Sequence, residues 1–180
     1  MNSMELIFLN LIGIYLGAFT VIIMLFLVLT IVFERKRNQK VKELLEKVAE
    51  EQGYTLEDAN DKTYDYELIN EESKILIKLV FVPTNSSITI NSKNTWCLRY
   101  GGSAHHRGYS NMKYLDKLIP FLEKEIVGSQ RKVLLVYPDT NKIQRYLNES
   151  EIAILKPGDK VYDYQVITFP DFTNRFQDLQ

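Results

Sequence analysis

A long apolar run near the N-terminus constrains this chain more than any other feature of its sequence. Residues 6–33 contain no Asp, Glu, Lys, Arg or His, and 23 of these 28 residues are Ala, Val, Ile, Leu, Met, Phe or Tyr. A helix of this length measures roughly 42 Å, which is more than the roughly 30 Å hydrocarbon core of a bilayer. The sequence therefore predicts a single transmembrane anchor over residues 1–33, tilted or extending into one interface.

The charges that flank this run predict its orientation. All 22 Lys and Arg follow residue 33, whereas the N-terminal flank carries only Glu5. The first six cations are Arg35, Lys36, Arg37, Lys40, Lys42 and Lys47. Because positive flanks face the cytoplasm, residues 34–180 are expected to be cytoplasmic and the N-terminus to lie outside the cell membrane. A cleavable signal peptide would begin with basic residues and end at small ones, so this segment should stay on the chain as an anchor.

The part of the chain beyond the anchor has 147 of the 180 residues, enough for one folded domain. Apolar residues at helical spacing, followed by Gly53, predict an amphipathic helix over residues 38–52. These apolar residues are Val41, Leu44, Leu45, Val48 and Ala49. The expected organisation is an anchor over 1–33, a juxtamembrane amphipathic helix over 34–53, and a cytoplasmic domain over 54–180.

Runs of alternating or β-branched apolar residues predict strands, and segments rich in Gly, Pro and Asn predict the turns between them. The expected strands cover residues 64–69, 75–82, 88–90, 95–100, 132–137, 152–155 and 161–169. Residues 64–69 and 75–82 should form a hairpin, which residues 88–100 extend as a meander. The Val-rich and Leu-rich run at 132–137 is typical of a strand buried on both faces.

Two further segments are expected to be helical. A second amphipathic helix is predicted over residues 112–126, kinked or divided at Pro120, and a helical turn over residues 140–147. The predicted fold class is α+β (or α/β), in which the N-terminal transmembrane helix precedes a small mixed-sheet domain of order αβββαβ.

The predicted hairpin carries an acid and a lysine in a pattern that resembles a known family of proteins. Asp65 lies on its first strand, and Leu76-Ile77-Lys78 lies on its second. With the αβββαβ order, this pattern resembles the core of the PD-(D/E)xK restriction-endonuclease-like superfamily over about residues 41–137. In that superfamily a strand Asp and an acid-x-Lys on the next strand bind Mg²⁺ and activate water. The resemblance implies Asp65 and Lys78 as the catalytic pair of a nuclease. Leu76 replaces the second acid, so the resemblance implies an inactive site.

A cationic stretch follows an acidic one along the domain. Residues 43–72 hold 11 acids against two Lys, whereas residues 73–115 hold no acid. The six cations of the second stretch are Lys74, Lys78, Lys93, Arg99, Arg107 and Lys113. A glycine loop with basic side chains before a helix is a common anion site, so we expect any ligand to be anionic. The expected contact residues are Arg99, Arg107, Lys113, Gly101 and Gly102. The alternative is that these cations pair with the acids of residues 43–72.

The sequence predicts no metal site and no cofactor. His105 and His106 are adjacent, so their side chains point in different directions, and Cys97 does not complete a ligand spacing. The chain also lacks the glycine patterns of mononucleotide and dinucleotide sites and the Gly-x-Ser-x-Gly of serine hydrolases.

The anchor itself offers a site of protein contact in the lipid bilayer. Gly13 and Gly17 are four residues apart, with Ala18 beside them, and this spacing lets two spanning helices approach closely. The pair predicts self-association, although Gly is also common in spanning helices that make no such contact.

These features favour a single-pass membrane-anchored protein whose cytoplasmic domain is a non-catalytic binding or scaffold module. Two alternatives stay open at this point. One is a membrane-tethered metal-dependent nuclease, against which the missing acid at Leu76 argues. The other is an accessory subunit of a membrane complex, docked through its span.

Overall fold

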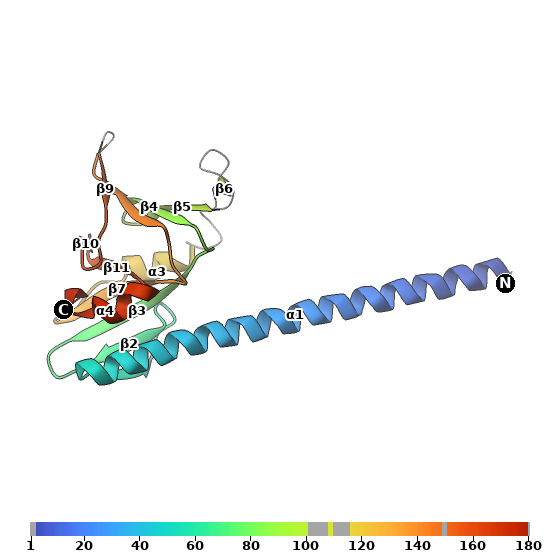
Figure 1. Cartoon of the computed structure of the whole chain (residues 1–180), viewed down its shortest axis with the longest axis horizontal. Helices are drawn as coiled ribbons and strands as arrows, with labels where there is room; N and C mark the ends of the chain where they lie inside the picture. Colours follow the sequence, from blue (N-terminus) through green and yellow to red (C-terminus); the bar gives the residue numbers. More distant parts are fainter. Residues whose placement is uncertain (1–2, 101–107, 110–115, 149–150, 180) are drawn as a thin grey trace. The chain divides into compact units, whose positions relative to one another are not determined.

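The computed structural model describes residues 3–100, 108–109, 116–148 and 151–179. The chain divides into two compact units, residues 1–43 and residues 44–180. Helix α1 (Ser3–Gln52) forms the described part of the first unit and the first residues of the second (Figure 1). The predicted anchor and the predicted juxtamembrane helix are therefore parts of one helix.

The apolar stretch of α1 exposes its side chains. The large hydrophobic side chains between Ile12 and Phe33 are 40% to 70% exposed. The hydroxyl groups of Thr20 and Thr30 donate to the carbonyls of Leu16 and Phe26, each at 2.8 Å, so neither needs a water partner. By length and composition this helix could cross a membrane, and its internally satisfied polar groups are compatible with lipid surroundings.

The last turns of α1 open the second unit. Leu45, Val48 and Ala49 are buried, which confirms the apolar face predicted for this part of the chain. Gly53 then adopts a φ of 72°, a left-handed conformation that glycine tolerates without steric cost, and the amide of Tyr54 donates to the carbonyl of Ala49 at 2.8 Å. This geometry ends the helix and turns the chain into the first strand.

The first sheet contains six strands in a mixed arrangement. In spatial order they are β1 (Thr55–Asp58), β2 (Tyr66–Ile69), β3 (Lys74–Phe81), β7 (Gln130–Tyr137), β11 (Tyr164–Thr168) and β10 (Lys160–Val161). β2 and β3 form the antiparallel hairpin that the sequence predicts, and β7 runs parallel to both β3 and β11. Residues 133–136 of β7 are fully buried, as expected for a strand covered on both faces.

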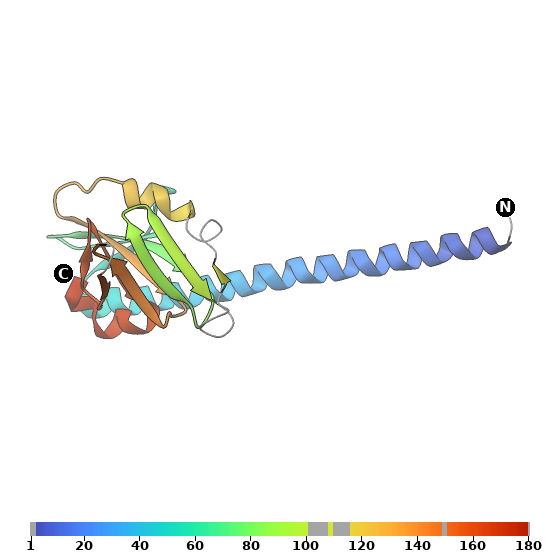
Figure 2. The same ribbon diagram turned by 90° about the horizontal axis from the view of Figure 1, so that it is seen from above.

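The second sheet contains the other five described strands. In spatial order they are β6 (Gly108–Tyr109), β5 (Thr95–Tyr100), β4 (Ser87–Ser92), β8 (Lys142–Tyr146) and β9 (Ile152–Ile154). Figure 2 shows the β4–β5 hairpin beside β8. The prediction that residues 88–100 extend the first meander is wrong, because β4 leaves that sheet and pairs with β8. The helical turn predicted over residues 140–147 is also wrong, since this segment is strand β8.

The helix predicted before β7 ends earlier than residue 126. Residues 112–115 lie outside the described residues, after which the 3₁₀ turn η1 (Asp116–Leu118) leads into α3 (Ile119–Glu123). Pro120 stands in the first turn of α3, where a missing amide costs no hydrogen bond, so it begins a helix instead of kinking one. Six described strands, rather than three, separate α1 from α3, so the simple αβββαβ order does not describe the whole domain.

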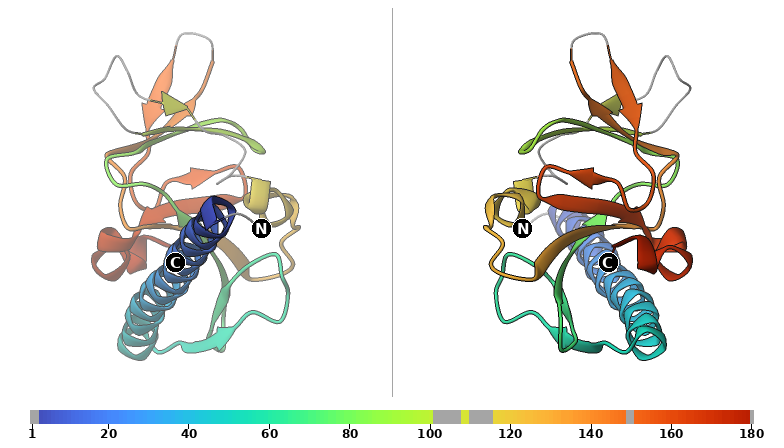
Figure 3. Two further views of the ribbon diagram at one scale, coloured as in Figure 1. Left: turned by 90° about the vertical axis from the view of Figure 1, so that its right-hand side faces the viewer. Right: turned by 90° about the vertical axis from the view of Figure 1, so that its left-hand side faces the viewer.

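The strands of the first sheet lie between α3 and α4 (Phe169–Asn174), as Figures 2 and 3 show. One face of this sheet packs with α3 and the second sheet in a single apolar cluster. Its members include Trp96, Phe121, Leu122, Leu134 and Tyr164. On the α4 side, the turn η2 (Phe176–Leu179) buries Phe176 and Leu179. The domain is thus a layered α+β fold.

Candidate functional site

The β2–β3 hairpin brings Asp65 and Lys78 together. Asp65 immediately precedes β2, and its amide donates to the carbonyl of Ile77, which fixes the register with β3. Lys78 Nζ lies 3.1 Å from Asp65 Oδ1, and Asp65 Oδ2 accepts a hydrogen bond from the amide of Leu79 at 2.7 Å. Both oxygens of the carboxylate therefore have a donor, and the charge that could attract a metal ion is balanced by the ammonium group.

A second carboxylate, Glu67, is buried two residues further along the strand. The Tyr64 hydroxyl donates to Glu67 Oε1, and Lys74 forms an ion pair with Glu67 Oε2. Burial, followed by the hydrogen bond to Glu67, raises the pKa of Tyr64 to about 12. The tyrosine therefore stays protonated at neutral pH and keeps donating to Glu67. This carboxylate is enclosed and paired with Lys74, so it could take the place of the acid missing at Leu76 as a metal ligand only by breaking both contacts.

Leu76 occupies the place that the resemblance would give to the second acid. The antiparallel register sets it directly opposite Glu67, and the parallel register with β7 sets it opposite Lys132. Leu76 is 1% exposed and belongs to the apolar cluster that also contains Tyr64. An oxygen ligand is replaced here by packed hydrocarbon, which cannot coordinate Mg²⁺.

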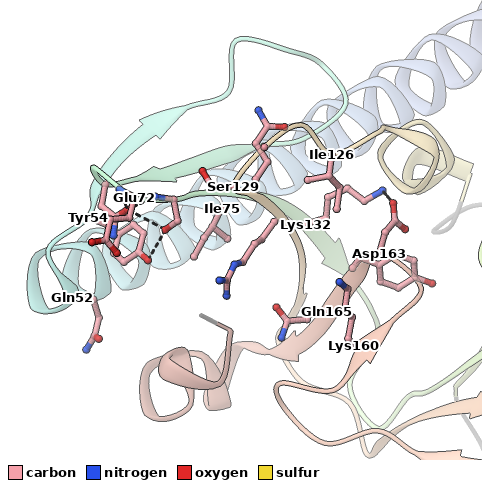
Figure 4. Close-up of a pocket in the computed structure, with 16 residues that line it drawn as sticks. Gln52, Tyr54, Glu72, Ile75, Ile126, Ser129, Lys132, Lys160, Asp163 and Gln165 are labelled. Carbon is pink, nitrogen blue, oxygen red and sulfur yellow. Dashed lines mark hydrogen bonds and ion pairs between the residues drawn. The ribbon is translucent and has the colours of Figure 1, made fainter.

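A charged cluster lies on the same face of the sheet, at β7. The Lys132 ammonium has no exposed surface and donates to the carbonyls of Leu122 and Lys124, each at 2.8 Å. It also lies 2.8 Å from Asp163 Oδ2, and Figure 4 shows these two side chains pointing toward each other. Lys93, in the turn between β4 and β5, pairs with the same Asp163 at 3.1 Å. This cluster therefore links the two sheets and the end of α3.

The surroundings of this cluster lower the pKa values of both Lys132 and Asp163. Burial lowers the pKa of Lys132, although the hydrogen bond and charge of Asp163 oppose that shift. For Asp163, burial acts to raise the pKa, but the hydrogen bonds from Lys132 and Lys93 outweigh it and hold the pKa below its usual range. The charged form of each group is therefore stabilised by the other.

A further ion pair fixes the segment between β1 and β2. Lys124 Nζ lies 2.9 Å from Asp61 Oδ2, and the ammonium also stands 5.5 Å from the centre of the Tyr64 ring. The hydrogen bond from Lys124, together with the amide of Thr63, lowers the pKa of Asp61 to about 2. This carboxylate, like Asp65, Glu67 and Asp163, is paired with a cation of the chain.

These contacts decide what the arrangement can do chemically. Within residues 3–100, 108–109, 116–148 and 151–179, no three His, Cys, Asp or Glu side chains converge in a way that could hold a metal ion. A metal-dependent nuclease needs such a group to bind Mg²⁺ and orient water. The described side chains form ion pairs that order the sheet and do not form an open cation site.

The anion site predicted for residues 73–115 falls mostly outside the described residues. The residues outside the described part of the chain include Gly101, Gly102, Arg107 and Lys113, together with His105 and His106. Arg99 is described, exposed and on β5, where it takes part in an interaction within the structure. Three other cations of that stretch, Lys74, Lys78 and Lys93, are paired with Glu67, Asp65 and Asp163. Two of these acids belong to residues 43–72, so the alternative weighed from the sequence holds for Lys74 and Lys78.

The Lys132–Asp163 cluster was missed by sequence reasoning. One signal was present, since Lys132 directly precedes an uninterrupted run of Val and Leu that has to be buried. A lysine entering such a strand needs a carboxylate or carbonyl partner. The sequence does not identify this partner, because Asp163 lies 31 residues further along the chain and comes close to Lys132 only through the pairing of β7 with β11.

Gly13 and Gly17 both lie in α1, and a Cβ added at either would meet no atom within 4 Å apart from the neighbouring residues and the backbone of the helix itself. Self-association through these residues stays a prediction.

Comparison of the chain with protein-family models, curated proteins and solved structures finds no match. The resemblance to the endonuclease-like superfamily likewise stays a prediction, and the function has to be argued from the geometry.

Proposed function

We propose that the chain is a single-pass membrane-anchored protein whose cytoplasmic domain is a non-catalytic binding or scaffold module. The observation that carries the proposal is the state of the hairpin site. Asp65 is paired with Lys78, Glu67 is enclosed by Tyr64 and Lys74, and hydrocarbon fills the position of Leu76. A site in this state has no place for the cation that a nuclease would use.

The anchoring part of the proposal is supported by α1. Its apolar side chains are exposed, and a stretch with 40% to 70% exposure of Ile, Leu, Val and Phe is unfavourable in water. The same surface is favourable in a bilayer, where the backbone and the two Thr hydroxyls are already hydrogen-bonded within the helix. The basic residues after Phe33 support an orientation with the domain in the cytoplasm.

Topology is tested by cysteine labelling in intact cells. In a Cys97→Ser background, Ile152→Cys reports on the domain, because Ile152 is 47% exposed on β9. Ser3→Cys is the matched variant on the other side of the span. We expect an impermeant maleimide to label Ser3→Cys in intact cells and Ile152→Cys only after permeabilisation. Strong labelling of Ile152→Cys in intact cells would place the domain outside and reject the proposed orientation.

Absence of metal-dependent cleavage is the second expected result. The purified full chain in detergent should leave single-stranded and double-stranded DNA and RNA intact with Mg²⁺ or Mn²⁺, because Leu76 supplies no oxygen ligand. Calorimetric titration with Mg²⁺ should give no saturable heat. The control variants are Asp65→Asn and Lys78→Met, which remove the pair while keeping side-chain size. Cleavage by the wild type that both variants lose would establish the nuclease instead.

A further inference from the structure

A cleft of about 770 Å³ opens at one end of the first sheet, away from the Asp65–Lys78 pair. It lies where β2 turns into β3 and where β7 and β11 begin, and Figure 4 shows the side chains around it. Its volume falls within the roughly 300–1,000 Å³ typical of small-molecule sites. Most of its lining residues are polar, which distinguishes it from a pocket for an apolar ligand.

The strand register brings three of these polar side chains to one face of the sheet. Gln165 is paired with Val133 of β7, and Arg131 lies two residues before Val133, so both point to the same side. Lys160 is paired with Gln165 across β10 and β11 and shares that side as well. The backbone pairing therefore places Arg131, Gln165 and Lys160 on the same face of the sheet.

Arg131 and Lys160 have no acidic partner among the ion pairs of the described residues. Within the described part of the chain, the ion pairs engage Lys74, Lys78, Lys93, Lys124 and Lys132 but neither of these two. Both side chains are exposed at the cleft. Arg131 uses Nη1 to hold the carbonyl of Leu179 at 2.9 Å, which orients the guanidinium and leaves its other donors available.

Two carboxylates also line the cleft, and neither cancels these cations. Asp163 is already neutralised by Lys132 and Lys93. Glu72 lies in the turn between β2 and β3, and Figure 4 shows it beside Tyr54, across the cleft from Lys160. The side that carries Arg131 and Lys160 is therefore locally positive. The opposite wall carries Gln52, Asn70 and Ser73, of which the Ser73 hydroxyl already donates to Asn70 Oδ1.

We propose that this cleft binds a small polar anion, with a terminal phosphate on Arg131 and Lys160 and a hydroxylated body against the amide wall. A guanidinium fork suits phosphate oxygens, and an ammonium group beside it adds charge without fixing geometry. The inference deepens the proposed function by naming a ligand class and a site for the binding module. It also assigns that site to residues of β7 and β10 and not to those of the glycine loop predicted from the sequence.

The test uses the full chain in nanodiscs and glycerol 3-phosphate as the probe. Calorimetry of the wild type should give saturable binding in the micromolar to millimolar range. Lys160→Glu should weaken binding at least tenfold, because it reverses a charge at the cleft. Lys142→Glu is the matched control, since Lys142 is an exposed strand cation outside this cleft, and it should bind as the wild type does. Thermal unfolding of each variant without probe separates loss of binding from loss of fold.

A second arm distinguishes a free phosphate compound from a lipid headgroup. If the site takes free ligands, nanodiscs of phosphatidylcholine alone and nanodiscs with added phosphatidic acid should give the same affinity. If it takes headgroups, the phosphatidic acid should compete with glycerol 3-phosphate in the wild type and not in Lys160→Glu. Either result supports the site. No saturable binding by the wild type, or equal weakening by Lys160→Glu and Lys142→Glu, would overturn it while leaving the membrane topology and the absence of cleavage as separate results.

Discussion

Asp163→Ala is expected to destabilise the domain by about 3–5 kcal/mol, because it leaves the fully buried Lys132 ammonium without its carboxylate. Two backbone carbonyls would remain as partners, and these satisfy hydrogen bonds without balancing the charge. For a domain of this size, each kcal/mol lowers the melting temperature by roughly 2–4 °C, so a drop of about 10 °C is expected. Thermal and urea unfolding of wild type and variant measure it.

A control variant and the pH dependence of stability show whether the loss comes from the buried Lys132–Asp163 pair. Lys93→Ala removes the partly exposed partner of Asp163 and should cost about 1 kcal/mol or less. The folded-state pKa of Asp163 is lowered, so its contribution to stability is present above its ordinary value, near pH 4, and is lost as the pH falls through the folded value. The gap between wild type and Asp163→Ala should therefore shrink below about pH 4. An equal effect of Lys93→Ala and Asp163→Ala would contradict a buried charge at Lys132.

The sequence predicted those elements whose signal is local. The β2–β3 hairpin follows from alternation around a turn, and β7 follows from a run of Val and Leu. Strand β8 was misread as a helical turn, because its sequence Lys-Ile-Gln-Arg-Tyr has one buried residue, Ile143, and no strong periodicity. What makes it a strand is parallel pairing with β4, more than fifty residues earlier in the chain, and no local pattern encodes that partner.

The same contrast separates the two charged sites. Asp65 and Lys78 are 13 residues apart, but a hairpin places them opposite each other, so their contact was implied by the resemblance on sequence alone. Lys132 and Asp163 meet because β7 and β11 are parallel neighbours, an arrangement known only once the sheet order is known. Arg131 and Lys160 share the cleft for the same reason. Sequence spacing therefore finds sites built within a hairpin and misses sites built across parallel strands.

Deletion of residues 176–180 is expected to unfold the domain. The deletion removes Phe176 and Leu179, which are at most 1% exposed in the turn η2. Phe176 meets the rings of Tyr54 and Phe172 edge to face, at centroid distances of 5.4 Å and 5.5 Å. Losing one large buried side chain costs about 2–5 kcal/mol, so losing two approaches the whole stability of about 5–15 kcal/mol for a typical domain. Circular dichroism and limited proteolysis of the deletion variant in detergent would show the loss.

Single substitutions in the same turn show whether the effect comes from burial or from the position of the segment. Phe176→Ala alone should cost about 3–5 kcal/mol, whereas Gln177→Ala, at an exposed neighbour, should stay within about 0.5 kcal/mol of the wild type. The carbonyls of Asp178 and Leu179 accept from Gln165 and Arg131, so a loosened η2 should also free these two side chains of the cleft. Phe176→Ala should therefore weaken glycerol 3-phosphate binding even where the domain stays folded. A deletion variant that melts at the wild-type temperature would show that η2 lies on the fold without supporting it.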